Sequence, residues 1–593
     1  MIDLFKSELL RFRTWCGAYA LLHFGLLAFF GRMVDPLQQP AIVYEIVAAV
    51  YGLSGLLLAL YQMGSYRRPN TWLILLHRPL PHWQIAAALL GAGACMMLVA
   101  VVLPLLLMLA GQAGLTARVV DARHWLLPLA AWLIAACCYL AGCFAMLAPR
   151  RIAAAALVLP LLFTASQATG PSALLVQGAV LAWLLALVFF AFKPDLSRPP
   201  SSWSSAPLVA VTVQMAVYLL LCTGALVYQL LWMLQGSHPL NSAPPAGGYI
   251  EASRADGADL IVAGLADSRK TSAPLWREQA RLAEVFTWQR QFDALPVRNE
   301  LGNIAPMEFD DEARRLRWIF SHDRMRLVGV NLVDGKPAGT LGLGAGKSTF
   351  PRPALPTGGR FLISTDTVYA YDTHELRVLP RIALPHGETF AVPPSAMGEV
   401  MFAASDRALY TFDARAFTDG DALLQPRQRI ALPGRIGDLD RVDVIELIDG
   451  YLVSFVFGLG STDGPGLPVQ KILQLQGDGR ATEVARRVLA PDFPIALRYY
   501  PFWLSPAMHA LRDGATRALS PAPALKRREV QAIPASMWGL ALLLMLACVP
   551  ASVWLSRRQR LARNSRMVWA LACATIGLPA LLSQRLIHPD GEA

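Results

Sequence analysis

Residues 85–110 read IAAALLGAGACMMLVAVVLPLLLMLA, a run of 26 residues without a charged side chain. A helix of about 20 apolar residues crosses the hydrocarbon core of a bilayer, so this run is long enough to span a membrane. Of the 593 residues in the chain, 55% are hydrophobic and 16% are charged, whereas soluble domains carry about 25% charged residues. The composition therefore argues against a soluble globular protein and for further runs of this kind.

Nine apolar runs approach the length of a membrane span, and the first and fifth of them, which begin at Trp15 and Ile152, are short. They predict an α-helical polytopic membrane protein with about nine transmembrane helices. The runs are Trp15–Phe30, Ala41–Leu60, Ile85–Ala110, Trp125–Leu147, Ile152–Ser166, Ala173–Phe192, Pro207–Leu234, Met537–Leu555 and Met567–Leu582.

The distribution of Lys and Arg predicts the orientation, because short cytoplasmic loops collect positive charge. With the N-terminus inside, about 15 cations fall on inner segments and about four on short outer ones. The outer ones are Arg32, Arg118, Arg123 and Arg585. We expect a bacterial inner-membrane protein with a cytoplasmic N-terminus and with the C-terminal tail, residues 583–593, in the periplasm. Residues 236–536 carry as many acidic as basic side chains, so the formal charge of +11 reflects topology and does not indicate nucleic-acid binding.

The connections divide the chain further. Residues 1–14 place Ile2, Phe5, Leu9 and Phe12 on one helical face and predict a cytoplasmic interfacial helix, with a frayed basic tail as the alternative. Residues 15–193 form a six-span unit. A Pro- and Ser-rich cytoplasmic linker, 194–206, separates it from the seventh span at 207–235. Residues 537–582 hold the eighth and ninth spans.

The cytoplasmic loop 62–84 contains SYRRPNTWLILLHRPLPHWQ, residues 65–84, in which cations flank an apolar centre. Pro69 can begin a helix, and Pro79 and Pro81 would end it. The result is a short surface helix whose apolar side needs lipid headgroups or a protein partner.

The large outer region, 236–536, is predicted to be all-β because short apolar runs alternate with Gly, Pro and Asp turns. VGVN at 328–331, YAYD at 369–372 and YTFD at 410–413 are spaced by about 41 residues, the length of a propeller blade. RIALP follows the second and third copies, at 381–385 and 429–433, and a degenerate fourth copy lies at 473–476. A β-propeller-like domain is the first interpretation and a β-sandwich the alternative.

Few side chains indicate chemistry within the chain itself. LGLGAGKST, residues 341–349, ends like a phosphate-binding loop, but Leu341 stands where that loop requires glycine. All eight cysteines lie in the apolar runs, and no catalytic, cofactor or metal site is predicted. Glu45, inside the second span, is a candidate for a polar pathway because an ionisable group there is costly and often functional.

The first 200 residues resemble the membrane subunits of type 2 ATP-binding-cassette (ABC) exporters. The resemblance lies in the basic entry helix, the two spans, the cytoplasmic helical loop, the long third span and the short fifth one. It implies that the loop is a coupling helix that docks on a separate ATPase subunit. An acidic residue common just before this loop is absent, with Gln62 and Ser65 in its place. The matching residues are Arg67, Arg68, Trp72, Leu75, Leu76, His77, Arg78 and Pro79.

The resemblance implies a permease subunit that moves a substrate using ATP-Mg bound on the partner ATPase. It also implies a second permease copy, either identical or different. The outer domain would be a receiver, gate or docking surface for the substrate or a periplasmic partner. The alternative is a membrane-anchored periplasmic binding or sensor protein without transport activity.

Overall fold

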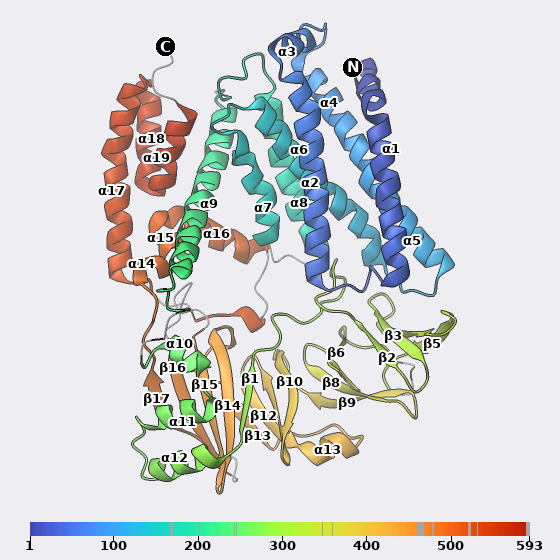
Figure 1. Ribbon diagram of the computed structural model, residues 1–593, viewed down its shortest axis with the longest axis vertical. Helices are drawn as coiled ribbons and strands as arrows, with labels where there is room; N and C mark the ends of the chain where they lie inside the picture. The colour runs from blue at the N-terminus through green and yellow to red at the C-terminus, as the bar shows by residue number, and fades with distance from the viewer. Residues whose placement is uncertain are drawn as a thin grey trace.

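The computed structural model has a helical bundle at one end and a β region at the other (Figure 1). It describes residues 1–165, 170–200, 202–241, 244, 246–344, 346, 348–358, 360–458, 468–476, 480–519, 524–529 and 532–588. Among these residues, seven helical runs are long and apolar enough to cross a membrane. They are Ile2–Met33, Ala41–Tyr66, His82–Leu115, Ala122–Leu147, Ser172–Ala191, Ser205–Leu234 and Ala535–Arg558.

These runs contain seven of the nine predicted spans. α1 (Ile2–Met33), α2 (Ala41–Tyr66), α8 (Pro171–Ala191), α9 (Ser205–Leu234) and α17 (Ala535–Arg558) are single helices. The third run joins α4 (His82–Met97) to α5 (Leu103–Leu115) through a π-helical turn, Leu98–Val102. Pro104 follows that turn and cannot donate a backbone hydrogen bond, which accounts for the local change of winding. The fourth run joins a 3-10 turn, Ala122–Leu126, to α6 (Leu127–Leu147).

The prediction of a separate interfacial helix at residues 1–14 is wrong, because α1 continues without a break from Ile2 to Met33. Its buried face also differs from the expected one. Leu4, Glu8 and Phe12 are buried at a spacing of four residues, while Ile2 is exposed. The first 14 residues are therefore the first turns of a long helix.

The region predicted as the short fifth span contains a 3-10 turn, Ala153–Leu157, followed by α7 (Val158–Ala165). Eight residues of α-helix rise about 12 Å, which is less than half of a bilayer core. The end of the predicted span, Ser166, lies outside the described residues.

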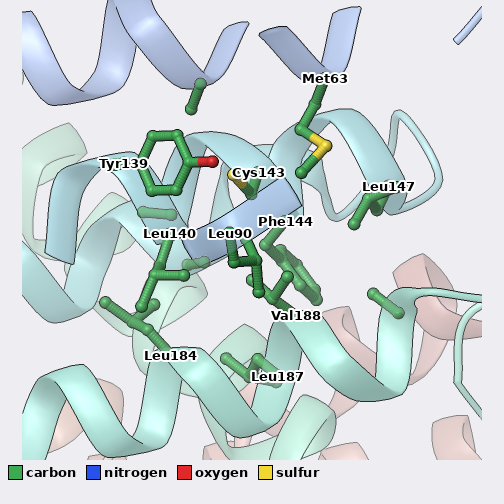
Figure 2. Close-up of a cluster of buried hydrophobic side chains, with 14 of the residues drawn as sticks. Met63, Leu90, Tyr139, Leu140, Cys143, Phe144, Leu147, Leu184, Leu187 and Val188 are labelled. Atoms are coloured by element: carbon green, nitrogen blue, oxygen red, sulfur yellow. The ribbon is translucent and has the colours of Figure 1, made fainter. Parts of the chain in front are cut away.

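The core of the bundle lies between α2, α4, α6 and α8, where large apolar side chains interdigitate (Figure 2). Helices α2 and α6 approach closely because glycines face the partner backbone. A Cβ on Gly55 would lie 2.1 Å from the Ala135 carbonyl oxygen, and one on Gly142 would lie 2.8 Å from Ala59 Cβ. Small residues of this kind let membrane helices pack tightly.

The C-terminal part corrects the predicted topology. Two short helices, α18 (Arg563–Ile576) and α19 (Leu578–Ile587), stand in place of the ninth span. Gly577, at φ +78°, reverses the chain between them. The Gln559 side chain at the end of α17 donates to the His588 carbonyl, so the chain returns to the end of the bundle where the N-terminus lies (Figure 1). His588, the last described residue, is therefore at the end of the bundle opposite the β region, and residues 589–593 lie outside the described residues.

The strands of the outer region form four separate antiparallel sheets in chain order. The first contains β2 (Glu308–Asp311), β3 (Leu316–Ser321), β4 (Arg326–Asn331) and β5 (Pro337–Leu341). The second contains β6 (Leu355–Pro356), β7 (Phe361–Ile363), β8 (Thr367–Asp372) and β9 (Arg377–Ala383). The third contains β10 (Phe390–Met397), β11 (Val400–Ser405), β12 (Ala408–Asp413) and β13 (Gln428–Ala431). The fourth contains β14 (Leu439–Leu447), β15 (Gly450–Phe457), β16 (Val469–Gln476) and β17 (Ala481–Val488), with β1 (Val285–Gln289) added beside β14.

The internal repeat is confirmed. VGVN, YAYD, YTFD and the degenerate copy at 473–476 lie in β4, β8, β12 and β16, the third strand of each four-strand succession. The two RIALP segments begin within the fourth strands, β9 and β13. Each repeat is therefore one antiparallel sheet.

Strands cover only part of the range 236–536 that was predicted to be β. Before the sheets, α10 (Tyr249–Arg254), α11 (Gly257–Leu265) and α12 (Ala273–Leu282) pack on the fourth one. A short helix, α13 (Ala414–Asp419), follows β12. After the sheets, α14 (Ile495–Arg498), α15 (Tyr500–Leu504) and α16 (Pro506–Leu519) lead back to the bundle. Tyr218 of α9 donates to the Pro501 carbonyl oxygen at 2.9 Å, which ties this return segment to the membrane helices.

Candidate functional site

The predicted surface helix exists as α3 (Pro69–Leu76), at the end of the bundle remote from the β region (Figure 1). Pro69 occupies its first turn, where a missing backbone N–H costs nothing. The helix ends at His77, just before Pro79 and Pro81. The boundaries thus follow from the three prolines.

Three of the residues expected to contact a partner face the protein instead. Trp72, Leu75 and Leu76 are buried in the core of the bundle. The Trp72 ring meets Phe192 edge-on at 5.0 Å between centroids, and its indole N–H donates to the Lys193 carbonyl oxygen at 3.2 Å. These side chains anchor α3 to the start of the linker after α8, so they are unable to form a docking surface.

The opposite side of α3 is open. Leu73 is 48% exposed and Ile74 is 69% exposed, which are high fractions for apolar side chains next to a buried tryptophan. Arg68, His77, Arg78 and Pro79 are exposed beside them, and Arg67 is half-buried. We call Arg68, Leu73, Ile74, His77 and Arg78 the outward face of α3. Helical spacing in the sequence could have separated the two sides of α3. Positions 72, 75 and 76 share one side of a helix, and positions 73, 74 and 77 share the other.

A buried carboxylate lies near the start of this loop, although the sequence places no acid there. Glu8 of α1 is buried, and its Oε2 accepts a hydrogen bond from Gln62 Nε2 at 3.1 Å. Tyr66 donates to the other carboxylate oxygen, and Tyr139 of α6 donates to Gln62 Oε1 at 2.8 Å. The carboxylate that contacts Gln62 therefore comes from α1. Fifty-four residues separate the two, and the entry helix gave no signal of the contact.

Glu45 lies in the second turn of α2, at the end of the bundle that faces the β region, and its side chain is exposed. The buried side of α2 begins only at Tyr51 and Gly52. The structure therefore does not bring Glu45 together with the other candidate residues.

A second polar cluster, not foreseen from the sequence, joins the bundle to the β region. Asp121, in the loop after α5, accepts hydrogen bonds from Ser321 Oγ at 2.6 Å and from the His322 backbone N–H at 2.8 Å. In return, the Ala122 N–H donates to Asp323 Oδ2 at 2.7 Å. The turn after β3 is therefore bonded to a loop some 200 residues earlier in the chain.

Arg123 extends this junction. Its guanidinium donates to the Glu300 carbonyl oxygen at 3.0 Å and to Asn303 Oδ1 at 2.7 Å, and it lies 3.7 Å from Asp121. Asn303 Nδ2 donates in turn to the Leu37 carbonyl oxygen at 2.7 Å, in the loop between α1 and α2. We call Asp121, Arg123, Glu300, Asn303 and His322 the domain junction.

Burial controls the electrostatics of the domain junction. Glu300 is 1% exposed, and desolvation raises the pKa of its carboxyl to about 7, despite the nearby Arg123. Desolvation lowers the pKa of His322 to about 3, with Arg123 adding to the effect, so this imidazole is neutral at physiological pH. Its Nδ1 accepts a hydrogen bond from the Asn299 backbone N–H at 3.1 Å, which fixes the tautomer.

The hydrogen bonds of the domain junction connect the bundle to the β region. Within the described ranges, no three His, Cys, Asp or Glu side chains are grouped so that they could hold a metal ion. The segment resembling a phosphate-binding loop forms a turn, in which the Leu343 N–H donates to the Ser348 carbonyl oxygen at 3.0 Å. Ala345 and Lys347 of that segment lie outside the described residues.

Comparison with known proteins gives no assignment: no family model matches the sequence, and no curated protein matches it.

Proposed function

We propose that this chain is the permease subunit of an ABC-type exporter of the bacterial inner membrane. A separate ATPase subunit would bind ATP-Mg and dock on the outward face of α3 in the cytosol. The observation that carries the proposal is this face, an apolar pair ringed by cations, at the end of the bundle opposite the β region. Such a composition suits a protein interface with an apolar centre and a charged rim.

The mechanism follows from the two buried clusters. Closure of the ATPases would push on α3, which is anchored through Trp72 and linked to α2 by the short turn at Arg67 and Arg68. The Glu8–Gln62–Tyr139 hydrogen bonds connect the inner ends of α1 and α2 with α6, so a shift of one helix is passed to the others. Two permease copies would then alternate access to a pathway between them, as a nucleotide-driven population shift.

The β region is assigned to the periplasm, as an open, propeller-like fan of four blades. Support comes from two apolar cores that join the sheets in chain order. One core contains Trp318, Tyr369 and Tyr410 of the first three sheets. The next contains Phe402 of the third sheet and Val453 of the fourth. The domain junction ties the first blade to the outer loops, so movement of α1, α2 and α6 would reorient a receiver or gate for the exported substrate.

The test is co-purification in mild detergent followed by ATP hydrolysis. The Ile74→Asp and Arg78→Glu variants should lose the nucleotide-hydrolysing partner and its stimulated activity by about tenfold or more, since central interface residues carry most binding energy. The Ile448→Asp variant is the matched control, because Ile448 is a 91% exposed isoleucine in the β region. Equal ATPase recovery and activity in all variants would contradict the proposal. They would favour the alternative, a membrane-anchored binding or sensor protein.

A further inference from the structure

A cavity of about 490 Å³ opens between α9 and α19, and its lining combines positive charge with hydrocarbon. Two arginines, Arg151 and Arg585, contribute the charge. Among the residues that the structure describes, no acidic side chain lines the cavity, and the other lining side chains are aliphatic: Val217, Leu220, Leu221, Leu582 and Leu586.

The two arginines come from distant parts of the chain. Arg151 lies in the turn between α6 and the following 3-10 helix, and Arg585 lies near the end of α19. The fold of α18 and α19 brings them together, because it returns the chain to the side on which α6 ends (Figure 1). A straight ninth span would have placed Arg585 on the other side.

Neither guanidinium is used within the protein. Both side chains are exposed, and neither makes a hydrogen bond or ion pair with any part of the chain that the structure describes. Arginine forms paired hydrogen bonds with phosphate oxygens, so two arginines in the lining of one cavity offer donors to a phosphate group.

The depth of the cavity defines the rest of the ligand. Gln584, the neighbour of Arg585, donates to Ser556 Oγ at 2.8 Å in the last turns of α17, so the arginines lie near the end of the bundle. The leucines of α9 and α19 continue from there along the membrane helices. A phosphate-binding pair of arginines beside an apolar wall fits an anionic phospholipid. The headgroup would lie at the arginines, and an acyl chain would lie along the leucines.

We propose that Arg151 and Arg585 form a binding site for one anionic phospholipid of the leaflet that faces the α3 end of the bundle. The inference rests on the membrane location in the proposed function but requires no ATPase. Lipid between α9 and α19 would fill the space beside the C-terminal hairpin.

The test is native mass spectrometry of the purified full chain, titrated in detergent with phosphatidylglycerol or phosphatidylcholine. Each Arg→Gln change at 151 or 585 should weaken phosphatidylglycerol binding about fivefold, and the double variant about 25-fold, since an arginine at a membrane surface contributes about a factor of five. Phosphatidylcholine binding should change little. Arg563→Gln is the matched control, because Arg563 is exposed at the start of α18 but does not line the cavity.

Three results would overturn the site. An equal loss in the Arg563→Gln control would mean that general positive charge attracts the lipid. An equal loss of phosphatidylcholine binding in the arginine variants would mean that the negative charge of the headgroup is not recognised. Displacement of the lipid by millimolar inorganic phosphate would indicate a site for a free anion. Thermal unfolding of each variant checks that the fold is retained, and an intact ATPase interaction with no lipid selectivity would reject this site alone.

Discussion

Asp121 and Arg123 show how few side chains connect the two parts of the molecule. Both residues lie in the short segment between α5 and α6. Their side chains form hydrogen bonds with backbone or side-chain groups of residues 300–323. In the sequence, Arg123 was notable only as one of the four cations predicted to lie on outer segments. An arginine on an outer loop is disfavoured during insertion, so one that stays there beside an aspartate indicates a local partner. The sequence could not name that partner, because Glu300 and Asn303 lie some 180 residues away.

Glu300 gives the domain junction a measurable pH dependence. Its folded pKa of about 7 lies above the value near 4.3 expected when unfolded. The folded state therefore binds the proton more tightly, and its contribution makes the protein more stable as pH falls from 7 toward 4.5. The slope is at most about 1.4 kcal/mol per pH unit. Glu300→Gln mimics the protonated form, so this variant should unfold at a higher temperature than the unchanged protein at pH 8, with the difference closing by pH 5.

Comparing the Glu300→Gln variant with the unchanged protein separates the effect of Glu300 on stability from that of His322. The lowered pKa of His322 acts in the opposite direction, since the unfolded imidazole takes up a proton below pH 6.5 and destabilises the fold in acid. Both proteins contain His322, so its effect cancels in the difference of apparent melting temperatures. Glu312→Gln, at an exposed glutamate in the turn between β2 and β3, is the control. If the difference in apparent melting temperature between Glu300→Gln and the unchanged protein were the same at pH 5 and pH 8, burial would not shift the pKa of this carboxyl.

At the scale of elements, helices α18 and α19 differ most from the expectation. The apolar run 567–582 has the composition of a span, and only Gly577 and Pro579 within it signal a break. Gln584 completes the reversal by bonding to Ser552, Ser556 and Gln559 of α17. Window-based hydropathy cannot detect this, because the polar residues that hold the hairpin lie outside the apolar run.

Gly577 is the residue on which the reversal depends. At φ +78°, a Cβ would be strained and would also lie 3.1 Å from Met545 Cγ. Gly577→Ala should destabilise the protein by about 1–3 kcal/mol, measured as a fall in apparent melting temperature. Gly539→Ala, within α17 and with open space around it, should be neutral or stabilising by about 0.5–1 kcal/mol. Equal melting temperatures for the two variants would mean that the turn tolerates a side chain.

The repeat in the β region was the most successful element-scale prediction. A pattern of four residues located the third strand in all four sheets, because each buried strand needs the same alternation of apolar side chains. The flanking helices α10–α12 and α14–α16 were missed, since their short length resembles loop sequence. For α3, the prolines gave the boundaries, but the interpretation of its apolar residues ignored helical spacing.

At the scale of the whole molecule, the long axis separates two surfaces. The N-terminus, α3 and the end of α19 lie at one end of the bundle, and the β region lies beyond the other (Figure 1). Placing Arg585 at the α3 end removes one of the four cations counted as outer, so the structure sharpens the charge asymmetry. This distribution of charge agrees with the proposed orientation, in which α3 would lie in the cytosol and the β region in the periplasm.

Cysteine labelling tests this arrangement most directly. Ile74→Cys and Ile448→Cys are made separately in a background whose eight native cysteines are changed to alanine. Intact cells with a permeabilised outer membrane are treated with a membrane-impermeant maleimide. We predict that Ile448→Cys is labelled at once and that Ile74→Cys is labelled only after the inner membrane is opened. Labelling of the Ile74→Cys variant from outside would contradict a cytosolic docking surface and the coupling of this chain to an ATPase.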